Sequence, residues 1–94
     1  MKEVDDLIEQ EEIVLFIACQ VLDYSLSAHV PKKAITNKIK DMNPKYLRKA
    51  FNSLISNGFL VEHPTRRNIT YGLTPKGLRA GTIIYHRKFG NLSY

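Results

Sequence analysis

The chain has 94 residues, of which 44% are hydrophobic and 24% are charged, and its net charge is +5. These values predict one folded domain with a modest core, and no stretch approaches the ~18 apolar residues that span a bilayer. The single cysteine, Cys19, excludes a disulfide within the chain and any Cys-X-X-Cys metal site. Its apolar neighbours predict a buried thiol, with an intermolecular disulfide as the alternative. No targeting segment is recognisable, which predicts a cytoplasmic protein without a membrane partner.

The charges are distributed unevenly along the chain. Residues 1–23 hold one basic and seven acidic side chains, a net charge of −6, whereas residues 24–94 hold thirteen basic and two acidic side chains, a net charge of +11. Residues 24–94 are basic enough to attract polyanions, and nucleic acid is the commonest polyanion in a cytoplasm. The basic residues do not lie on one amphipathic helix opposite large apolar residues, which argues against a membrane surface.

The first segment predicts a long helix from about Val4 to Tyr24, because it lacks glycine and proline and carries apolar residues at helical spacing. Its acids lie in the early turns, where the helix dipole favours them, so we expect a solvated helix start rather than a catalytic carboxylate cluster. Ile13, Phe16 and Ile17 add apolar surface outside the main stripe. A helix that is apolar on several sides is buried on several sides, and we expect a second subunit to cover the extra side.

A connection over 25–30 leads to the second predicted helix, over 32–40. Pro31 suits the first turn of that helix, because its fixed φ matches the helix and its missing N–H is not needed there.

A tight turn at 41–42 separates this helix from the third one. Asn43 is a favourable N-cap and Pro44 a favourable first helical residue. We therefore expect the third helix to run from Pro44 to about Asn57, with Gly58 as its C-terminal stop.

After the third helix the apolar periodicity changes from 3.6 to 2. This change predicts two strands, Phe59–His63 and Ile69–Thr74, joined by a polar turn over 64–68. Thr74 and Pro75 then cap and open a last helix that reaches about Lys88. One face of this helix carries Leu78, Thr82, Tyr85 and Phe89. Ile83 and Ile84 point in other directions.

This order of elements predicts an α+β, mainly α, fold: a winged helix-turn-helix with a three-helix core, a two-stranded β wing and a C-terminal helix. The single domain, 1–94, divides into the N-terminal helix (1–24), the helix-turn-helix (31–58), the wing (59–74) and the C-terminal helix (75–89). The stretch NPKYLRKAFNSLISNGFL, Asn43 to Leu60, resembles the recognition helix of winged-helix regulators. LTPKG, Leu73 to Gly77, is similar to the segment that closes the wing in MarR-like and PadR-like transcription regulators. The resemblance covers about Val30 to Gly81 and implies a small DNA-binding regulator.

The third helix has the side chains that reading a major groove requires. At 100° per residue, Leu47, Phe51 and Leu54 form its core side, and the opposite side carries cations, an amide and hydroxyls but no acid. Lysine and arginine contact phosphates or guanine, and asparagine pairs with adenine. We therefore expect DNA contacts from Lys45, Tyr46, Arg48, Lys49, Asn52 and Ser53 on this helix, from Lys32 and Lys33 at the start of the second helix, and from Arg66 and Arg67 at the wing tip. Lys38 and Lys40 are weaker candidates for the same role.

No catalytic constellation is recognisable in the sequence. His29, His63 and His86 are scattered along the chain, and the glycines match no phosphate-binding loop. We therefore expect a protein that is not an enzyme and that has no metal site, no cofactor and no evident small-molecule ligand.

The function that these residues favour is a sequence-selective double-stranded DNA-binding transcription regulator, a repressor by occlusion acting as a homodimer on a palindromic site. The expected dimer interface holds Ile13, Phe16, Ile17, Ile83 and Ile84, with Gly81 permitting close helix approach. Two alternatives stay open at this point, namely an RNA-binding, ribosome-associated winged helix and a module that binds an acidic protein partner.

Overall fold

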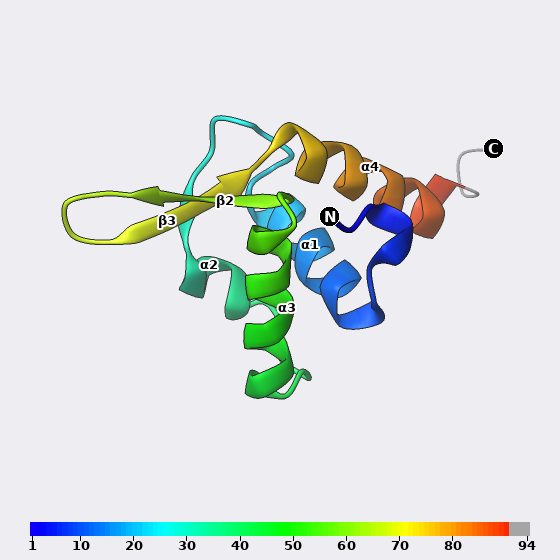
Figure 1. Cartoon of the computed structure of the whole chain (residues 1–94), viewed down its shortest axis with the longest axis horizontal. Coiled ribbons are helices and arrows are strands. Elements are labelled where there is room, and N and C mark those ends of the chain that lie inside the picture. Colours follow the sequence, from blue (N-terminus) through cyan, green and yellow to red (C-terminus); the bar gives the residue numbers. More distant parts are fainter. Residues whose placement is uncertain (91–94) are drawn as a thin grey trace.

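The structure, a computed structural model, describes residues 1–90, and Figure 1 shows how their elements are arranged. In chain order these are the 3-10 turn η1 (Val4–Asp6), α1 (Glu9–Val21), β1 (Val30–Pro31), α2 (Lys32–Thr36), α3 (Pro44–Ser56), β2 (Leu60–Pro64), β3 (Ile69–Leu73) and α4 (Pro75–Phe89). The fold of these residues is α+β and mainly helical, and its antiparallel sheet has the strand order β1-β3-β2. The arrangement is consistent with a winged helix. Among residues 1–90 no helix is long and apolar enough to cross a membrane.

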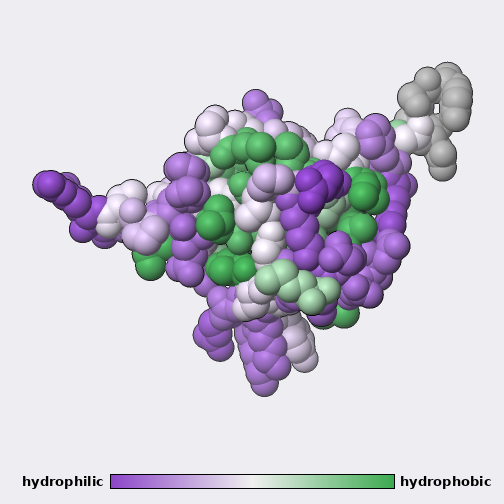
Figure 2. Space-filling model, turned by 45° about the horizontal axis from the view of Figure 1, so that its top comes forward, coloured by the Kyte–Doolittle hydropathy of each residue, from purple (hydrophilic) through white to green (hydrophobic). Residues whose placement is uncertain are grey.

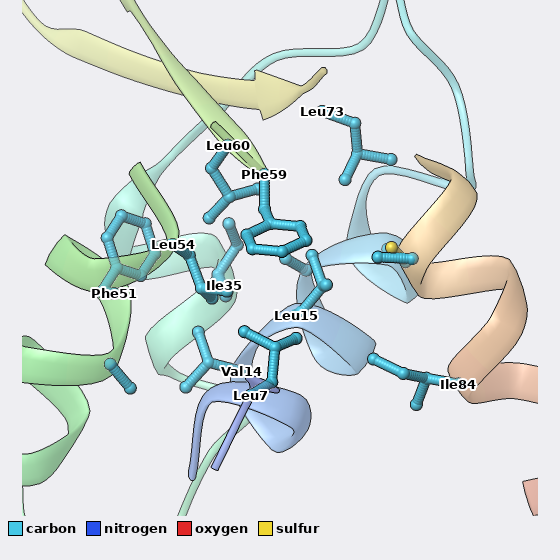
Figure 3. Packing of buried hydrophobic residues seen from close by; sticks show 14 of the residues in the cluster. Leu7, Val14, Leu15, Ile35, Phe51, Leu54, Phe59, Leu60, Leu73 and Ile84 are labelled. Carbon is cyan, nitrogen blue, oxygen red and sulfur yellow. The ribbon is translucent and has the colours of Figure 1, made fainter. Parts of the chain in front are cut away.

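The hydrophobic core lies where α1, α3, α4 and the inner ends of β2 and β3 meet (Figure 3). Leu15 of α1, Phe51 of α3 and Phe59, directly before β2, are completely buried there. Ile35 of α2 joins the same cluster, so the two short helices of the predicted helix-turn-helix are both anchored in the core.

The predicted starts of α3 and α4 are confirmed by their cap hydrogen bonds. The Asn43 side chain accepts the N–H of Lys45 at 2.8 Å, and the Thr74 hydroxyl accepts the N–H of Gly77 at 2.9 Å. Gly58 ends α3 with a φ of +78°, a left-handed conformation that glycine adopts without strain.

The long first helix predicted from Val4 is wrong in its first turns, because the chain breaks at Leu7 and Ile8. Two carboxylates produce the break by capping separate elements. The Asp6 side chain accepts the N–H of Glu3, and the Glu11 side chain accepts that of Ile8, both at 2.9 Å. The interrupted segment lets Leu7 reach the core, where it is buried.

The second helix is shorter than predicted and ends at Thr36 instead of Lys40. The N–H groups of Lys38 and Ile39 donate three residues back, at 3.1 and 3.0 Å, so the chain tightens into turns and leaves the helix. The preceding connection also contains a strand that the sequence did not predict. In β1, Val30 pairs with Tyr71 and Pro31 with Thr70 of β3. Proline fits there because β1 is an edge strand.

The β2–β3 hairpin matches the predicted wing strands to within one residue. Its register runs from Leu60 opposite Leu73 at the core to Pro64 opposite Ile69 at the outer end. The turn beyond closes with the Thr65 N–H donating to the Asn68 carbonyl at 2.7 Å. The hairpin extends away from the helices in Figure 1.

The core side of α4 consists of Gly77, Ala80, Gly81 and Ile84, all of them buried. Ile84 therefore belongs to the core of this chain, and the structure does not leave it for a subunit interface. Gly81 also acts within the chain, because a Cβ at this position would lie 2.2 Å from the Cys19 sulfur of α1. The buried thiol predicted for Cys19 is confirmed, and its burial raises the pKa of Cys19 to about 12.

Candidate nucleic-acid interface

The outward side of α3 is exposed along its whole length. Within residues 1–90 neither another element nor the N-terminal segment covers it, and α3 projects from the body at its N-terminal end (Figure 1). We call this side the free face of α3; it consists of Lys45, Arg48, Lys49, Asn52 and Ser56, all exposed. The opposite side, with Ala50, Phe51 and Leu54, is buried.

The free face lies in the basic part of the molecule. Residues 25–74 hold nine basic and two acidic side chains, a net charge of +7, and residues 44–56 contain no acid. The remaining described residues, 1–24 and 75–90, hold five basic and seven acidic side chains, a net charge of −2. Figure 2 shows hydrophilic side chains gathered on the projecting lower end of the molecule and at the hairpin tip.

The wing tip presents both predicted arginines. Arg66 and Arg67 are exposed, and no ion pair within residues 1–90 engages either of them. The turn that carries them is held by Thr65, whose hydroxyl donates to the Asn68 carbonyl at 2.8 Å and accepts the Asn68 N–H at 3.0 Å. The two guanidinium groups are therefore presented on a hydrogen-bonded turn.

The two lysines at the start of α2 have different surroundings. The Lys32 ammonium lies 4.9 Å from the centroid of the Phe51 ring, so a cation–π contact holds its half-buried side chain against α3. Lys33 is exposed. The weaker candidates, Lys38 and Lys40, are also exposed, but they lie beyond the end of α2.

Tyr46 and Ser53 lie on the flank of α3 that faces α1, not on the free face. Both line a hollow of about 380 Å³ together with Ile8, Gln10 and Glu11 from the N-terminal part of the chain, and Lys49 at the edge of the free face borders the same hollow. Tyr46 remains exposed, whereas the half-buried Ser53 donates its hydroxyl hydrogen to the Glu11 carboxylate. The structure thus gives the Ser53 hydroxyl a partner inside the protein.

Glu11 contradicts the expectation of a fully solvated acidic helix start, because it is only 1% exposed. Its carboxylate oxygens accept the Lys2 ammonium at 2.9 and 3.0 Å and the Ile8 N–H at 2.9 Å, besides the Ser53 hydroxyl. Burial by itself raises the pKa of Glu11, but the hydrogen bonds from Ser53, Lys2 and Ile8 outweigh it and hold the pKa below 4.5. One local feature indicated this role. Glu11 lies three residues after Ile8, the residue that precedes α1, and a glutamate at this spacing can cap the start of a helix.

The same network fastens the N-terminal segment to the end of α3. The Lys2 N–H donates to the Asn57 side-chain oxygen at 2.9 Å, and the Lys76 ammonium donates to the Asn57 carbonyl, also at 2.9 Å. The position of α3 is therefore fixed by polar contacts along its flank and at its C-terminal end.

His29 and His63, scattered in the sequence, are stacked in the structure, with ring centroids 3.7 Å apart. The sheet register explains the contact. Gly72 of β3 lies beside His29, where a Cβ would meet the Ala28 carbonyl oxygen at 2.9 Å and the His29 ring at 3.0 Å. No group of three or more histidines, cysteines and acids within residues 1–90 is placed to hold a metal ion.

No family model matches the chain, and no curated protein matches it either. Two solved structures are similar to it. The structure titled SSV1 F-93 covers 94% of this chain and 97% of its own, with a TM-score of 0.66 and 19% identity. The structure titled type III plasmid segregation TubR covers 87% of this chain and 89% of its own, with a TM-score of 0.53 and 20% identity. At these identities the similarity shows a shared fold.

Proposed function

We propose that this chain is a sequence-selective double-stranded DNA-binding protein, a winged-helix transcription regulator that represses by occluding its site and acts as a homodimer. The observation that carries the proposal is the free face of α3, which is exposed, free of acids and rich in groups that contact DNA. No catalytic role is included in the proposal.

The chemistry of the free face fits the major groove. Lysine and arginine side chains bind phosphates or the acceptors of guanine, and an asparagine amide pairs with adenine. Lys45 lies in the first turn of α3, which is the part of a recognition helix that approaches base edges. Asn52 is the one amide on this face, and we assign to it the reading of an adenine.

The wing supplies a second contact. Arg66 and Arg67 lie at the end of a hairpin that projects from the body, and paired arginines suit a phosphate or a narrow, electronegative minor groove. Lys33 at the start of α2 adds a phosphate contact that fixes position without reading sequence. One structural neighbour is named for the segregation of plasmids, which are DNA molecules, and this supports DNA as the partner.

The test begins with selection of bound duplexes from a random pool, followed by affinity measurements on the preferred site and on an unrelated duplex. We expect log affinity to fall with log salt at about −0.9 per phosphate contacted. Asn52→Ala is expected to lose ~1–3 kcal/mol, or about 5- to 150-fold, on the preferred site alone, whereas Arg66→Ala weakens both duplexes alike.

The matched control is Asn37→Ala, which removes an exposed amide at the end of α2 that is not part of the free face. It is expected to change neither affinity. Equal losses on both duplexes for Asn52→Ala would contradict major-groove reading. If the protein bound RNA of the same sequence more tightly than DNA, RNA would be its partner.

A further inference from the structure

Four aromatic side chains form a continuous row along the outer side of α1 and α4. Ring centroids are 6.1 Å apart for Tyr24 and Tyr85, 5.0 Å for Tyr85 and Phe89, and 6.1 Å for Phe89 and Phe16. Tyr85 and Phe89 are 43% and 41% exposed, because the side of α4 that is buried in this chain carries Gly77, Ala80, Gly81 and Ile84. This aromatic row is therefore an apolar surface that the single chain leaves uncovered.

A hollow lies beside this row, between the two helices. It measures about 420 Å³ and is lined by Gln20 and Tyr24 from the α1 side and by Thr82 and Tyr85 of α4. An aromatic side chain from outside fits a space of this size. A row of protruding rings next to a hollow is self-complementary, as a surface that pairs with its own copy must be.

The charges also favour a second copy at this place. The part of the molecule that contains α1 and α4 has a net charge of −2, whereas residues 25–74 carry +7. Two copies that met through their +7 parts would repel each other, and those parts would then be lost to a polyanion. The nearly neutral part allows two copies to approach.

The two ends of the aromatic row carry opposite charges. At one end the Lys88 ammonium lies 5.5 Å from the centroid of the Phe16 ring. At the other end the exposed Asp23 precedes Tyr24, and no ion pair within residues 1–90 engages Asp23. When two α4 helices pair antiparallel about a two-fold axis, the Lys88 end of each copy faces the Asp23 end of the other.

We infer that a second copy of this chain docks on the aromatic row of α1 and α4, with the two α4 helices antiparallel across a two-fold axis. The inference deepens the homodimer of the proposed function and does not depend on DNA binding. It also moves the interface. Of the residues expected from sequence, Phe16 lies in the row, whereas Ile13 and Ile17 line a different hollow beside Met42.

Ile83, another residue of the expected interface, lies on the opposite side of α4. It lines a separate hollow with Val4, Phe59 and Lys76, beside the N-terminal turn. Ile83 and Tyr85 are thus two residues apart on one helix, with nearly equal exposures of 40% and 43%, and they point to different faces. This pair gives a matched test of which face binds the second copy.

The experiment measures the mass of the full chain without DNA by sedimentation equilibrium. We expect the wild type to have twice its chain mass of 10.8 kDa. Tyr85→Lys is expected to raise the dissociation constant of the dimer at least about 100-fold, because it places a charge in an apolar interface. Ile83→Lys is expected to leave the constant unchanged. Circular dichroism verifies that each variant is folded, and Thr82→Arg, which fills the hollow from an exposed position, replaces Tyr85→Lys if the latter unfolds.

Three outcomes would overturn the inference: a monomeric wild type, dissociation by Ile83→Lys with Tyr85→Lys still dimeric, or dimers that resist both Tyr85→Lys and Thr82→Arg. These outcomes are separate from failure of the proposed function. A dimer that binds no duplex leaves the interface standing and removes the DNA-binding proposal. A monomer that binds duplexes selectively removes the interface and leaves the DNA-binding proposal standing.

Discussion

Helix α1 makes contacts of different kinds with α4 and with α3. Toward α4 it packs closely at one point, where the Cys19 sulfur lies against the backbone at Gly81. Toward α3 it presents the buried Glu11 carboxylate, which accepts a hydrogen bond from Ser53. The first contact requires a small residue at one position, and the second requires a charged acceptor with all its donors in place.

The two contacts control different geometrical quantities. Apolar packing is not directional, so it sets how close α4 comes to α1. The buried apolar residues of α3 fix its phase, and the hydrogen bond from Ser53 to Glu11, which is directional, adds a second constraint on the rotation of α3 about its own axis. The aromatic row depends on the first contact, and the second contact helps the apolar side of α3 to keep the free face directed outward.

Gly81→Ala tests the apolar contact and has the largest expected effect. Its Cβ would lie 2.2 Å from the Cys19 sulfur, so one helix must move. We expect a loss of about 2 kcal/mol in the free energy of unfolding, as for overpacked cores. For a domain of this size that corresponds to a melting temperature lower by about 10 °C, measurable by circular dichroism.

Two further variants sharpen this measurement. Arg79→Ala, at an exposed position of the same helix, is expected to change stability by less than about 0.5 kcal/mol. Cys19→Ala removes the sulfur and makes room for the new Cβ, so the double variant Cys19→Ala/Gly81→Ala should recover part of the loss. A double variant no more stable than Gly81→Ala would show that the sulfur is not the obstacle.

Local signals in the sequence predicted the parts of the fold that are built locally. Asn43 with Pro44, and Thr74 with Pro75, are caps that depend on neighbours within three residues, so the starts of α3 and α4 were predicted correctly. The wing followed from a change of periodicity. The free face followed from helical geometry, because the phase of α3 is fixed by its own apolar residues.

Contacts between distant residues were not predictable in this way. Glu11 is buried because Ser53, 42 residues away, and Lys2 both donate to it, and no local pattern records that meeting. The stacking of His29 on His63 similarly requires the sheet register. For α4 a usable signal was present, since small residues at 77, 80 and 81 mark the side that packs closely and place Ile84 on that side.

Glu11→Gln tests the polar contact and has an intermediate expected effect. The variant keeps the shape but loses the charge that Lys2 and Ser53 bind, so we expect it to be about 1–2 kcal/mol less stable at neutral pH. The folded-state pKa of Glu11 lies below 4.5, so the wild-type advantage is present above that value and is lost as the pH falls through the lowered pKa. Urea unfolding at several pH values measures this difference.

The control for this variant is Glu12→Gln, one position along α1, whose carboxylate takes part in no ion pair within residues 1–90. It is expected to change stability by less than about 0.5 kcal/mol at any pH. A stability gap between wild type and Glu11→Gln that persists unchanged in strong acid would mean that the carboxylate charge is not what stabilises the contact.

Ser53→Ala has the smallest expected effect. It separates the two roles of α3, which packs against α1 on one flank and is proposed to contact DNA with its free face. Removing the hydroxyl takes one donor from Glu11, so we expect a loss of about 1 kcal/mol in stability, whereas Ser56→Ala on the free face should leave stability unchanged. Because Ser53 acts through the rotation of α3 and not through a base, its loss should weaken all duplexes slightly and equally. If Ser53→Ala instead abolished the preference between duplexes and left stability intact, the hydroxyl would belong to the DNA contact, and the rotation of α3 would have to be fixed by other groups.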